Sequence, residues 1–254
     1  MPSSHSRVRA GAILALTMLP SCIAQQDTAE RMRAARNELF TASKEDVQLF
    51  RSPGYLARKI NVVRDLMREE ILRQLNAGGW SDSTLLKRLP PVTNMEPNIG
   101  LGLVHKRLNG VDFVIISYCI LHGASAIPDS TDVIDAYRKG ADGYELVDQT
   151  GDGLANSMPK LEELPSPWTT EIWLLGHGQQ TGVMQYHERA RIYSFDGQHF
   201  KELWGHEPMR DAKFEIDRNE LKIQFVDEEA RHVMWLTLAL LPQGPKEISL
   251  LEVR

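Results

Sequence analysis

The spacing of apolar residues changes near residue 99 of the chain. Before that point apolar residues recur every three or four positions, which is the spacing of one face of an amphipathic helix. After it they alternate with polar residues, or run together in short stretches between turn dipeptides, which is typical of strands joined by hairpins. The pattern therefore predicts an α+β protein, with N-terminal helices packed on a mainly antiparallel β-domain.

Three helices are expected in the N-terminal part. Asp27-Thr28-Ala29-Glu30 has the form of a capping box and predicts a helix to about Phe40, and the similar signal at Ser43 predicts a short second helix. Ser52-Pro53 begins the longest helix, which Gly78-Gly79 ends. This helix carries one apolar stripe, expected to dock on the protein's own core, made of Leu56, Ile60, Val63, Met67, Ile71 and Leu75.

The stretch from Trp168 to Trp204 is the most strongly patterned part of the chain. Its Asp196-Gly197 dipeptide tolerates positive φ and predicts a two-residue hairpin turn, whereas a type I turn with Gly197 in a bulge would shift the partners. The two-residue register pairs Tyr193 with Phe200, Arg191 with Glu202 and Arg189 with Trp204. The motif Y-x-F-D-G-x-x-F-x-x-x-W resembles hairpins of β-propeller blades and of many exported β-domains, and we carry over no function from it.

A second hairpin is predicted at Asn109-Gly110, in a register that sets Arg107 opposite Asp112. The strand that follows, Val111 to Leu121, is apolar on both faces. Such a strand lies in the centre of a sheet and is covered on both sides, so we expect the helices to cover one of them.

The remaining strands favour a β-sandwich or an open barrel. A hairpin is expected at Gly140 to Gly143, residues 151–167 form a long proline-rich connection, and the whole β-region contains about ten strands. Propeller-like blades are the alternative architecture. The chain contains no repeat at a fixed period, which counts against that alternative.

The first 24 residues have the features of a signal peptide. Arg7 and Arg9 precede an apolar stretch, and Cys22-Ile23-Ala24 supplies a cleavage signal before Gln25. The alternative is a lipoprotein anchored through Cys22, because Leu19-Pro20-Ser21-Cys22 resembles the bacterial lipobox apart from its proline. The expected organisation is a signal peptide (1–24), a helical segment (25–98) and a β-domain (99–254), exported to the periplasm or secreted.

Composition removes several classes of function. The formal net charge is −5, and removing the two arginines of the predicted signal peptide makes it more negative, so no nucleic-acid partner is expected. Beyond the signal no segment is long and apolar enough to cross a bilayer. Cys119 lies within an apolar run and is predicted to be a small buried hydrophobic residue, not a catalytic thiol.

No complete catalytic motif occurs in the sequence. His177 and His187 are histidines that strands could bring together, but neither belongs to an H-E-x-x-H spacing. His122 and Ser125 lie in a His-Gly-Ala-Ser-Ala string that lacks the last glycine of a serine-hydrolase turn. We therefore predict no catalytic residues.

One string resembles a metal-binding loop. Asp148, Thr150 and Asp152 occupy positions one, three and five of an EF-hand-type calcium loop, and glycine follows at six. Position twelve is Pro159, where a bidentate glutamate is expected. Calcium is thus a weak candidate cofactor, and an ordinary turn is the preferred interpretation.

The sequence favours a non-catalytic exported module that binds a cell-envelope component, a carbohydrate or a protein. An extracytoplasmic hydrolase with a site built from loops is one alternative, and a structural scaffold is another. The candidate contacts for a binding module are aromatic: Trp168, Trp173, Trp204 and Trp235.

Overall fold

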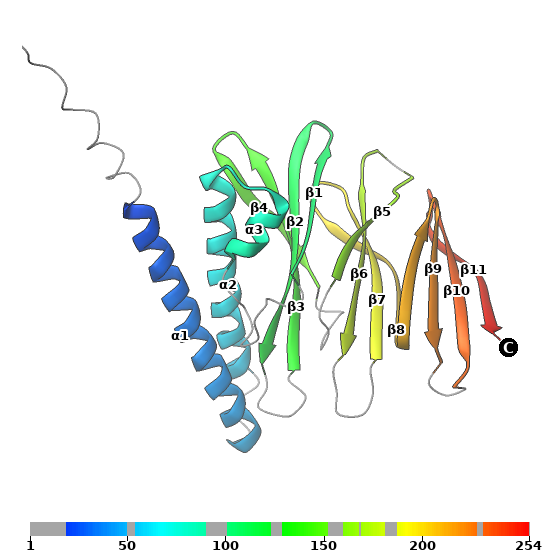
Figure 1. The fold of residues 1–254 in the computed structure, drawn as a ribbon, viewed down its shortest axis with the longest axis horizontal. Helices are drawn as coiled ribbons and strands as arrows, with labels where there is room; N and C mark the ends of the chain where they lie inside the picture. Colours follow the sequence, from blue (N-terminus) through cyan, green and yellow to red (C-terminus); the bar gives the residue numbers. More distant parts are fainter. Residues whose placement is uncertain are drawn as a thin grey trace, which may run out of the picture.

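Three helices form the first layer of the protein, in a computed structural model that describes residues 19–49, 54–89, 101–122, 129–151, 160–167, 169–180, 187–227 and 231–253. They are α1 (Leu19–Leu49), α2 (Gly54–Ala77) and α3 (Asp82–Arg88). In Figure 1 the long helices α1 and α2 lie side by side at one end of the molecule, and the strands follow one layer after another. None of the described helices combines the length and apolar character needed to cross a membrane.

The first helix differs from the prediction of two separate helices. It begins at Leu19 instead of Asp27 and continues unbroken past Phe40 and Ser43. No glycine or proline interrupts the sequence between Asp27 and Leu49, so the cap-like serine does not end the helix. Residues at helical spacing hold it against α2, namely the buried Met32, Ala35, Leu39 and Ala42.

The apolar stripe predicted for α2 is confirmed. Val63, Met67, Ile71 and Leu75 are buried in the cluster that joins the helices to the first sheet, and Leu56 and Ile60 pack at its margin. Docking of this stripe in the protein's own core is the arrangement expected for a surface helix of a globular protein.

The first sheet is a four-stranded antiparallel meander in the order β1-β2-β3-β4. Its strands are β1 (Gly102–Leu108), β2 (Val111–His122), β3 (Asp129–Gly140) and β4 (Gly143–Thr150). The Asn109-Gly110 turn is confirmed, because both residues have positive φ (51° and 82°) and Arg107 pairs with Asp112. The hairpin predicted at Gly140 to Gly143 also forms, since β3 pairs with β4 across it.

Strand β2 is covered on both faces, as its apolar sequence predicts. Ile116 and Tyr118 pack toward the helices, whereas Phe113 and Ile115 pack toward the second sheet. A buried ion pair links α2 to the first sheet. The Asp135 carboxylate of β3 accepts hydrogen bonds from Arg68 of α2 (2.7 and 2.9 Å) and from the Tyr118 and Tyr137 hydroxyls. A buried carboxylate with several donors is satisfied, and losing one partner would leave a costly buried charge.

The second sheet is a seven-stranded meander. It comprises β5 (Lys160–Leu164), β6 (Ile172–Gln180), β7 (His187–Phe195), β8 (Phe200–Asp217), β9 (Glu220–Val226), β10 (Val233–Leu241) and β11 (Gly244–Val253), in sequence order across the sheet. Residues 151–167 are thus not only a connection, because they contain β5. This strand has the polar sequence KLEEL, and it buries only Leu161 and Leu164.

Strand β8 divides the second sheet into two halves. Phe200 to Arg210 pair with β7, and Arg210 to Asp217 pair with β9, with a register shift and a positive φ at Asp211 (53°) between them. One cluster contains buried residues from both halves, such as Leu175 and Ile192 on one side and Ile223 and Leu238 on the other. Because residues of both halves are fully buried in this cluster, we infer that the sheet bends at β8 and that one half faces the other.

The Asp196-Gly197 hairpin does not adopt the predicted two-residue register. Phe195 pairs with Phe200 and Tyr193 with Glu202, which leaves a four-residue loop. The reason is local: the Asp196 carboxylate accepts hydrogen bonds from the backbone N–H groups of Gln198 (2.8 Å) and His199 (2.7 Å). A further shift lies between Ile192 and Tyr193 instead of at Gly197, so the predicted register does not form. The predicted ion pair between Arg191 and Glu202 is nevertheless present, with Arg191 Nε 3.5 Å from Glu202 Oε1.

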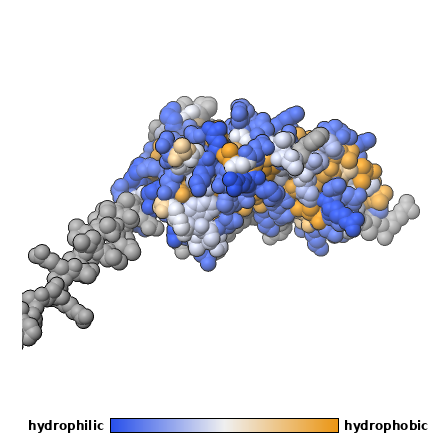
Figure 2. All heavy atoms as spheres, turned by 90° about the horizontal axis from the view of Figure 1, so that it is seen from above, coloured by the Kyte–Doolittle hydropathy of each residue, from blue (hydrophilic) through white to orange (hydrophobic). Residues whose placement is uncertain are grey.

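The overall architecture is a stack of layers. The helices cover one face of the first sheet, whose other face packs on β5 to β7, and the bend at β8 adds the last layer. The predicted sandwich is therefore confirmed, and the described strands close neither into a barrel nor into a ring of blades. At the far end, Ile248, Leu250 and Leu251 of the edge strand β11 are exposed, and Figure 2 shows apolar side chains gathered there.

Candidate ligand-binding site

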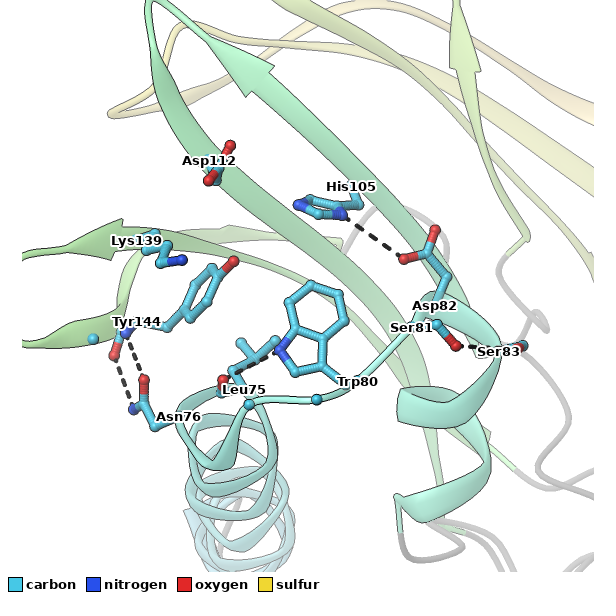
Figure 3. A pocket seen from close by; sticks show the side chains of 13 residues that line it. Leu75, Asn76, Trp80, Ser81, Asp82, Ser83, His105, Asp112, Lys139 and Tyr144 are labelled. Atoms are coloured by element: carbon cyan, nitrogen blue, oxygen red, sulfur yellow. Dashed lines mark hydrogen bonds and ion pairs between the residues drawn. The ribbon is translucent and has the colours of Figure 1, made fainter.

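A cavity lies where the helices meet the first sheet. Its volume is about 850 Å³, and it is lined by the C-terminus of α2, the start of α3, β1, β2 and the β3–β4 hairpin. We call it the Trp80 pocket. Figure 3 shows the aromatic, charged and amide side chains that line it: Asn76, Trp80, Asp82, His105, Asp112, Lys139 and Tyr144.

The connection between α2 and α3 positions Trp80. Gly78 and Gly79 both have positive φ (71° and 65°), a backbone conformation that ends α2 and that side-chain-bearing residues rarely adopt. The Trp80 indole Nε1 then donates a hydrogen bond to the Leu75 carbonyl (3.2 Å), and Ser81 caps α3 through a reciprocal capping box with Thr84. The indole is therefore held in place by helix termini on both sides.

Tyr144 is held by an amide of the helix. The Tyr144 backbone N–H donates to Asn76 Oδ1 (2.6 Å), and Asn76 Nδ2 donates to the Tyr144 carbonyl (3.4 Å). The neighbouring Gly143 has a φ of 125°, and a Cβ there would lie 2.5 Å from Asn76 Oδ1. The Asn76 amide thus satisfies the backbone N–H and carbonyl of Tyr144, as a neighbouring strand would.

Three rings form the walls of the pocket. The Trp80 ring lies 6.0 Å from the Tyr144 ring, edge to face at 64°, and 5.1 Å from the His105 imidazole at 53°. Both distances fall in the range of favourable aromatic contacts. Because the rings are tilted against one another, the pocket presents aromatic surface from more than one direction.

Charged groups surround these rings. In Figure 3 His105 lies between Asp82 and Asp112, and its Nδ1 is 3.8 Å from Asp82 Oδ1. The Lys139 ammonium lies 6.0 Å from the centroid of the Tyr144 ring. Burial, followed by the charge of Asp112, raises the pKa of Tyr144, so its hydroxyl remains a neutral donor and acceptor at physiological pH.

These properties are those of a ligand pocket. The volume lies within the range of small-molecule sites, and polar groups converge on a partly apolar wall. Within the described residues, no group of three or more His, Cys, Asp or Glu side chains is arranged to hold a metal ion.

Asp148, the first residue of the predicted calcium loop, has a structural partner. Its Oδ2 accepts a hydrogen bond from the Phe200 backbone N–H (2.7 Å), which ties β4 to β8 of the second sheet. Thr150 is the last residue of β4, and Asp152 lies outside the described residues. Calcium binding stays a prediction, although one of its three residues is engaged elsewhere.

His177 and His187 are not cross-strand partners, since His177 pairs with Ala190 and His187 with Gln180. His177 lies inside β6 and is buried against Phe214 (ring centroids 4.1 Å) with Nε2 3.3 Å from Glu162 Oε1. Burial lowers the pKa of His177, which suits a neutral structural imidazole. His187 begins β7, His122 ends β2, and Ser125 lies outside the described residues.

Of the four tryptophans predicted as contacts, three lie in the described residues, on strands of the second sheet. Trp173 is buried in the core, Trp204 stacks on His206 (6.0 Å), and Trp235 is half-buried on β10. Trp168 lies outside the described residues. Cys119 is buried, as predicted.

The pocket residues themselves were not among the sequence candidates. They come from three segments that are distant in sequence (75–83, 105–112 and 139–144), so no single linear motif contains them. One local signal does exist: Gly78-Gly79-Trp80-Ser81-Asp82 places an aromatic residue and a cap directly after a helix stop. An aromatic residue fixed in a loop between two helices is a stronger indication of binding than one on a strand.

Comparisons with known proteins identify no family for this chain and only weak structural similarity. No family model and no curated protein matches the chain. Two structures of the α-L-arabinofuranosidase Arb93A from Fusarium graminearum, both with an iminosugar inhibitor, match 64% of the chain at 11% identity, with TM-scores of 0.37 and 0.36. The match covers 50% of the arabinofuranosidase chain, so this protein spans about half of its length. A likeness of this degree carries no argument about function.

Proposed function

We propose that the protein is a non-catalytic binding module that holds a saccharide in the Trp80 pocket. The observation that carries the proposal is the combination of Trp80 and Tyr144, set at 64° to each other, with hydrogen-bonding side chains around them. A sugar ring has apolar C–H faces and a rim of hydroxyl groups. Aromatic walls contact the former, while carboxylates, an imidazole and an ammonium bind the latter.

The rigidity of the pocket supports this function. Trp80 is fixed by its hydrogen bond to Leu75, and Tyr144 by its two hydrogen bonds to Asn76. A site that is ordered before binding loses little conformational entropy when the ligand enters. The charged side chains Asp82, Asp112 and Lys139 are positioned by the backbones of α3, β2 and β3.

Saccharide binding is tested by calorimetric titration with oligosaccharides and by replacing Trp80. We expect Trp80→Ala to weaken binding about fivefold or more, since the loss of one well-packed aromatic contact is worth about 1 kcal/mol and leaves a void. Trp235→Ala, which removes a half-buried indole on β10, is the matched control and should leave the affinity unchanged. Equal affinities for the wild type and Trp80→Ala would refute the assignment of this pocket.

The proposed setting is the cell envelope. The signal-peptide features of residues 1–24 support export, with lipid attachment at Cys22 as the alternative. An exported saccharide-binding module would meet glycans of the envelope or of the surroundings.

A hydrolase is the second candidate, on one specific observation. His105 Nδ1 lies 3.8 Å from Asp82 Oδ1, and Asp112 lines the same cavity, so an imidazole and two carboxylates share one pocket. Incubation of the protein with oligosaccharides separates the candidates. Release of shorter sugars that stops in His105→Ala would favour the hydrolase over the binding module.

A further inference from the structure

We propose that the saccharide bound in the Trp80 pocket carries a protonated amino group, for which Asp112 is the main counter-charge and Asp82 the second. This inference rests on the proposed function and narrows its ligand to an amino sugar with a free amine. It follows from the balance of charge in the pocket, from the weak engagement of both carboxylates and from the orientation of the rings.

The side chains that line the pocket carry more negative than positive charge. Asp82 of α3 and Asp112 of β2 supply two carboxylates and Lys139 of β3 one ammonium, while Arg107, the loose partner of Asp112, lies outside the lining. His105 of β1 is a cation only when it is protonated. A ligand that brings a positive charge therefore improves the electrostatic balance, and one that brings a carboxylate worsens it.

Neither carboxylate is saturated by its protein partner. Asp82 lies 3.8 Å from the His105 imidazole, which exceeds the length of a hydrogen bond. Asp112 lies 3.7 Å from Arg107, whose side chain is 71% exposed, so this is a loose surface pair. Asp112 itself is only 33% exposed, and a ligand ammonium there would form a less solvated contact than Arg107 does.

The aromatic walls also suit a cation. The Lys139 ammonium lies 6.0 Å from the Tyr144 centroid, which shows that this ring already accommodates a positive charge nearby. Asp112 raises the pKa of Tyr144, which indicates that its negative charge is felt at the phenol. A second ammonium over the Trp80 face would gain both the ring quadrupole and the carboxylates.

Three trisaccharides of equal length test the charge preference by calorimetric titration: the glucosamine trimer, its fully N-acetylated form and the galacturonate trimer. We expect the glucosamine trimer to bind at least about tenfold more tightly than the neutral trimer, and the galacturonate trimer to bind most weakly. Asp112→Asn should reduce the preference for the amine by about tenfold, and Asp82→Asn by less. Asp142→Asn removes the same charge from the β3–β4 turn outside the pocket and should leave the preference intact.

The possible results separate the two proposals. Equal binding of the neutral and cationic trimers, with loss of both in Trp80→Ala, would retain saccharide binding and reject the amine. Tightest binding of the galacturonate trimer would reject the amine as well. Binding of none of the three would overturn both proposals. A preference for the amine that survives in the Asp112→Asn, Asp82→Asn double variant would assign it to another part of the surface.

Discussion

Glu188 shows how a single buried carboxylate makes the stability of the sandwich depend on pH. Burial raises its pKa to about 7, an effect that Lys160 opposes and Asp211 reinforces. Its Oε2 is buried without a hydrogen-bond partner among the described residues. The folded protein therefore binds a proton on Glu188 more tightly than the unfolded chain does, and ionisation of this group costs stability.

The first prediction at this scale is that Glu188→Gln stabilises the protein above neutral pH. The contribution of protonated Glu188 is fully present below the unfolded pKa near 4.5 and is lost as the pH rises through about 7. We expect Glu188→Gln to raise the free energy of unfolding by about 1–2 kcal/mol at pH 8, allowing for partial exposure, and to change it little at pH 5. Urea denaturation at both pH values measures this, with the exposed Glu215→Gln as control. A gain that is equal at both pH values would contradict the titration of Glu188.

At the level of elements, a hairpin or strand could be predicted from the sequence where neighbouring residues determine it, and could not where it depends on side-chain or tertiary contacts. The Asn109-Gly110 hairpin was predicted in its correct register because two adjacent residues determine that turn. The Asp196 hairpin was not, since the side chain of Asp196 selects a longer loop. β5 was missed because its apolar residues are few, and its pairing with β6 depends on the tertiary structure. The pocket was missed for the same reason, because its residues meet only after helices and sheet have packed.

A second prediction concerns the link between β4 and β8. Asp148→Ala removes the acceptor of the Phe200 backbone N–H, and we expect it to lower the free energy of unfolding by about 1–3 kcal/mol. Asp142→Ala, in the exposed turn of the same sheet, should have little effect.

Denaturation of both variants with and without calcium also tests the calcium loop. We expect calcium to leave the wild-type stability unchanged at micromolar concentration. Stabilisation of the wild type by micromolar calcium, absent in Asp148→Ala, would instead identify Asp148 as a metal ligand.

For the molecule as a whole, the spacing of apolar residues predicted the layered arrangement of helices and sheets. It did not predict the Trp80 pocket. The change of period near residue 99 distinguished helices from strands, and the two apolar faces of β2 placed that strand between layers. The bend of the second sheet at β8 has no comparable signal, because aspartate adopts positive φ in many ordinary turns and Asp211 therefore does not mark a bend.

The third prediction concerns the mature chain. The small residues before Gln25 predict cleavage after Ala24 and export without a lipid. α1 runs from Leu19 through this position, so cleavage would shorten the helix but spare its buried contacts from Met32 onward. Intact-mass measurement of the processed protein is decisive: a mass that begins at Gln25 agrees with the prediction, and a diacylglycerol-modified Cys22 would establish the lipoprotein.

The shared strand β8 also determines how the sandwich comes apart. Its first half carries the hydrogen-bond partners of β7 and its second half those of β9, so detaching the last layer exposes the cluster that contains Trp173. Unfolding of β9 to β11 therefore also exposes the apolar side chains of β5 to β7 that they cover. In native-state hydrogen exchange, the amides of β6 and β10 should open together as one cooperative unit, although 52 residues (181–232) separate them along the chain.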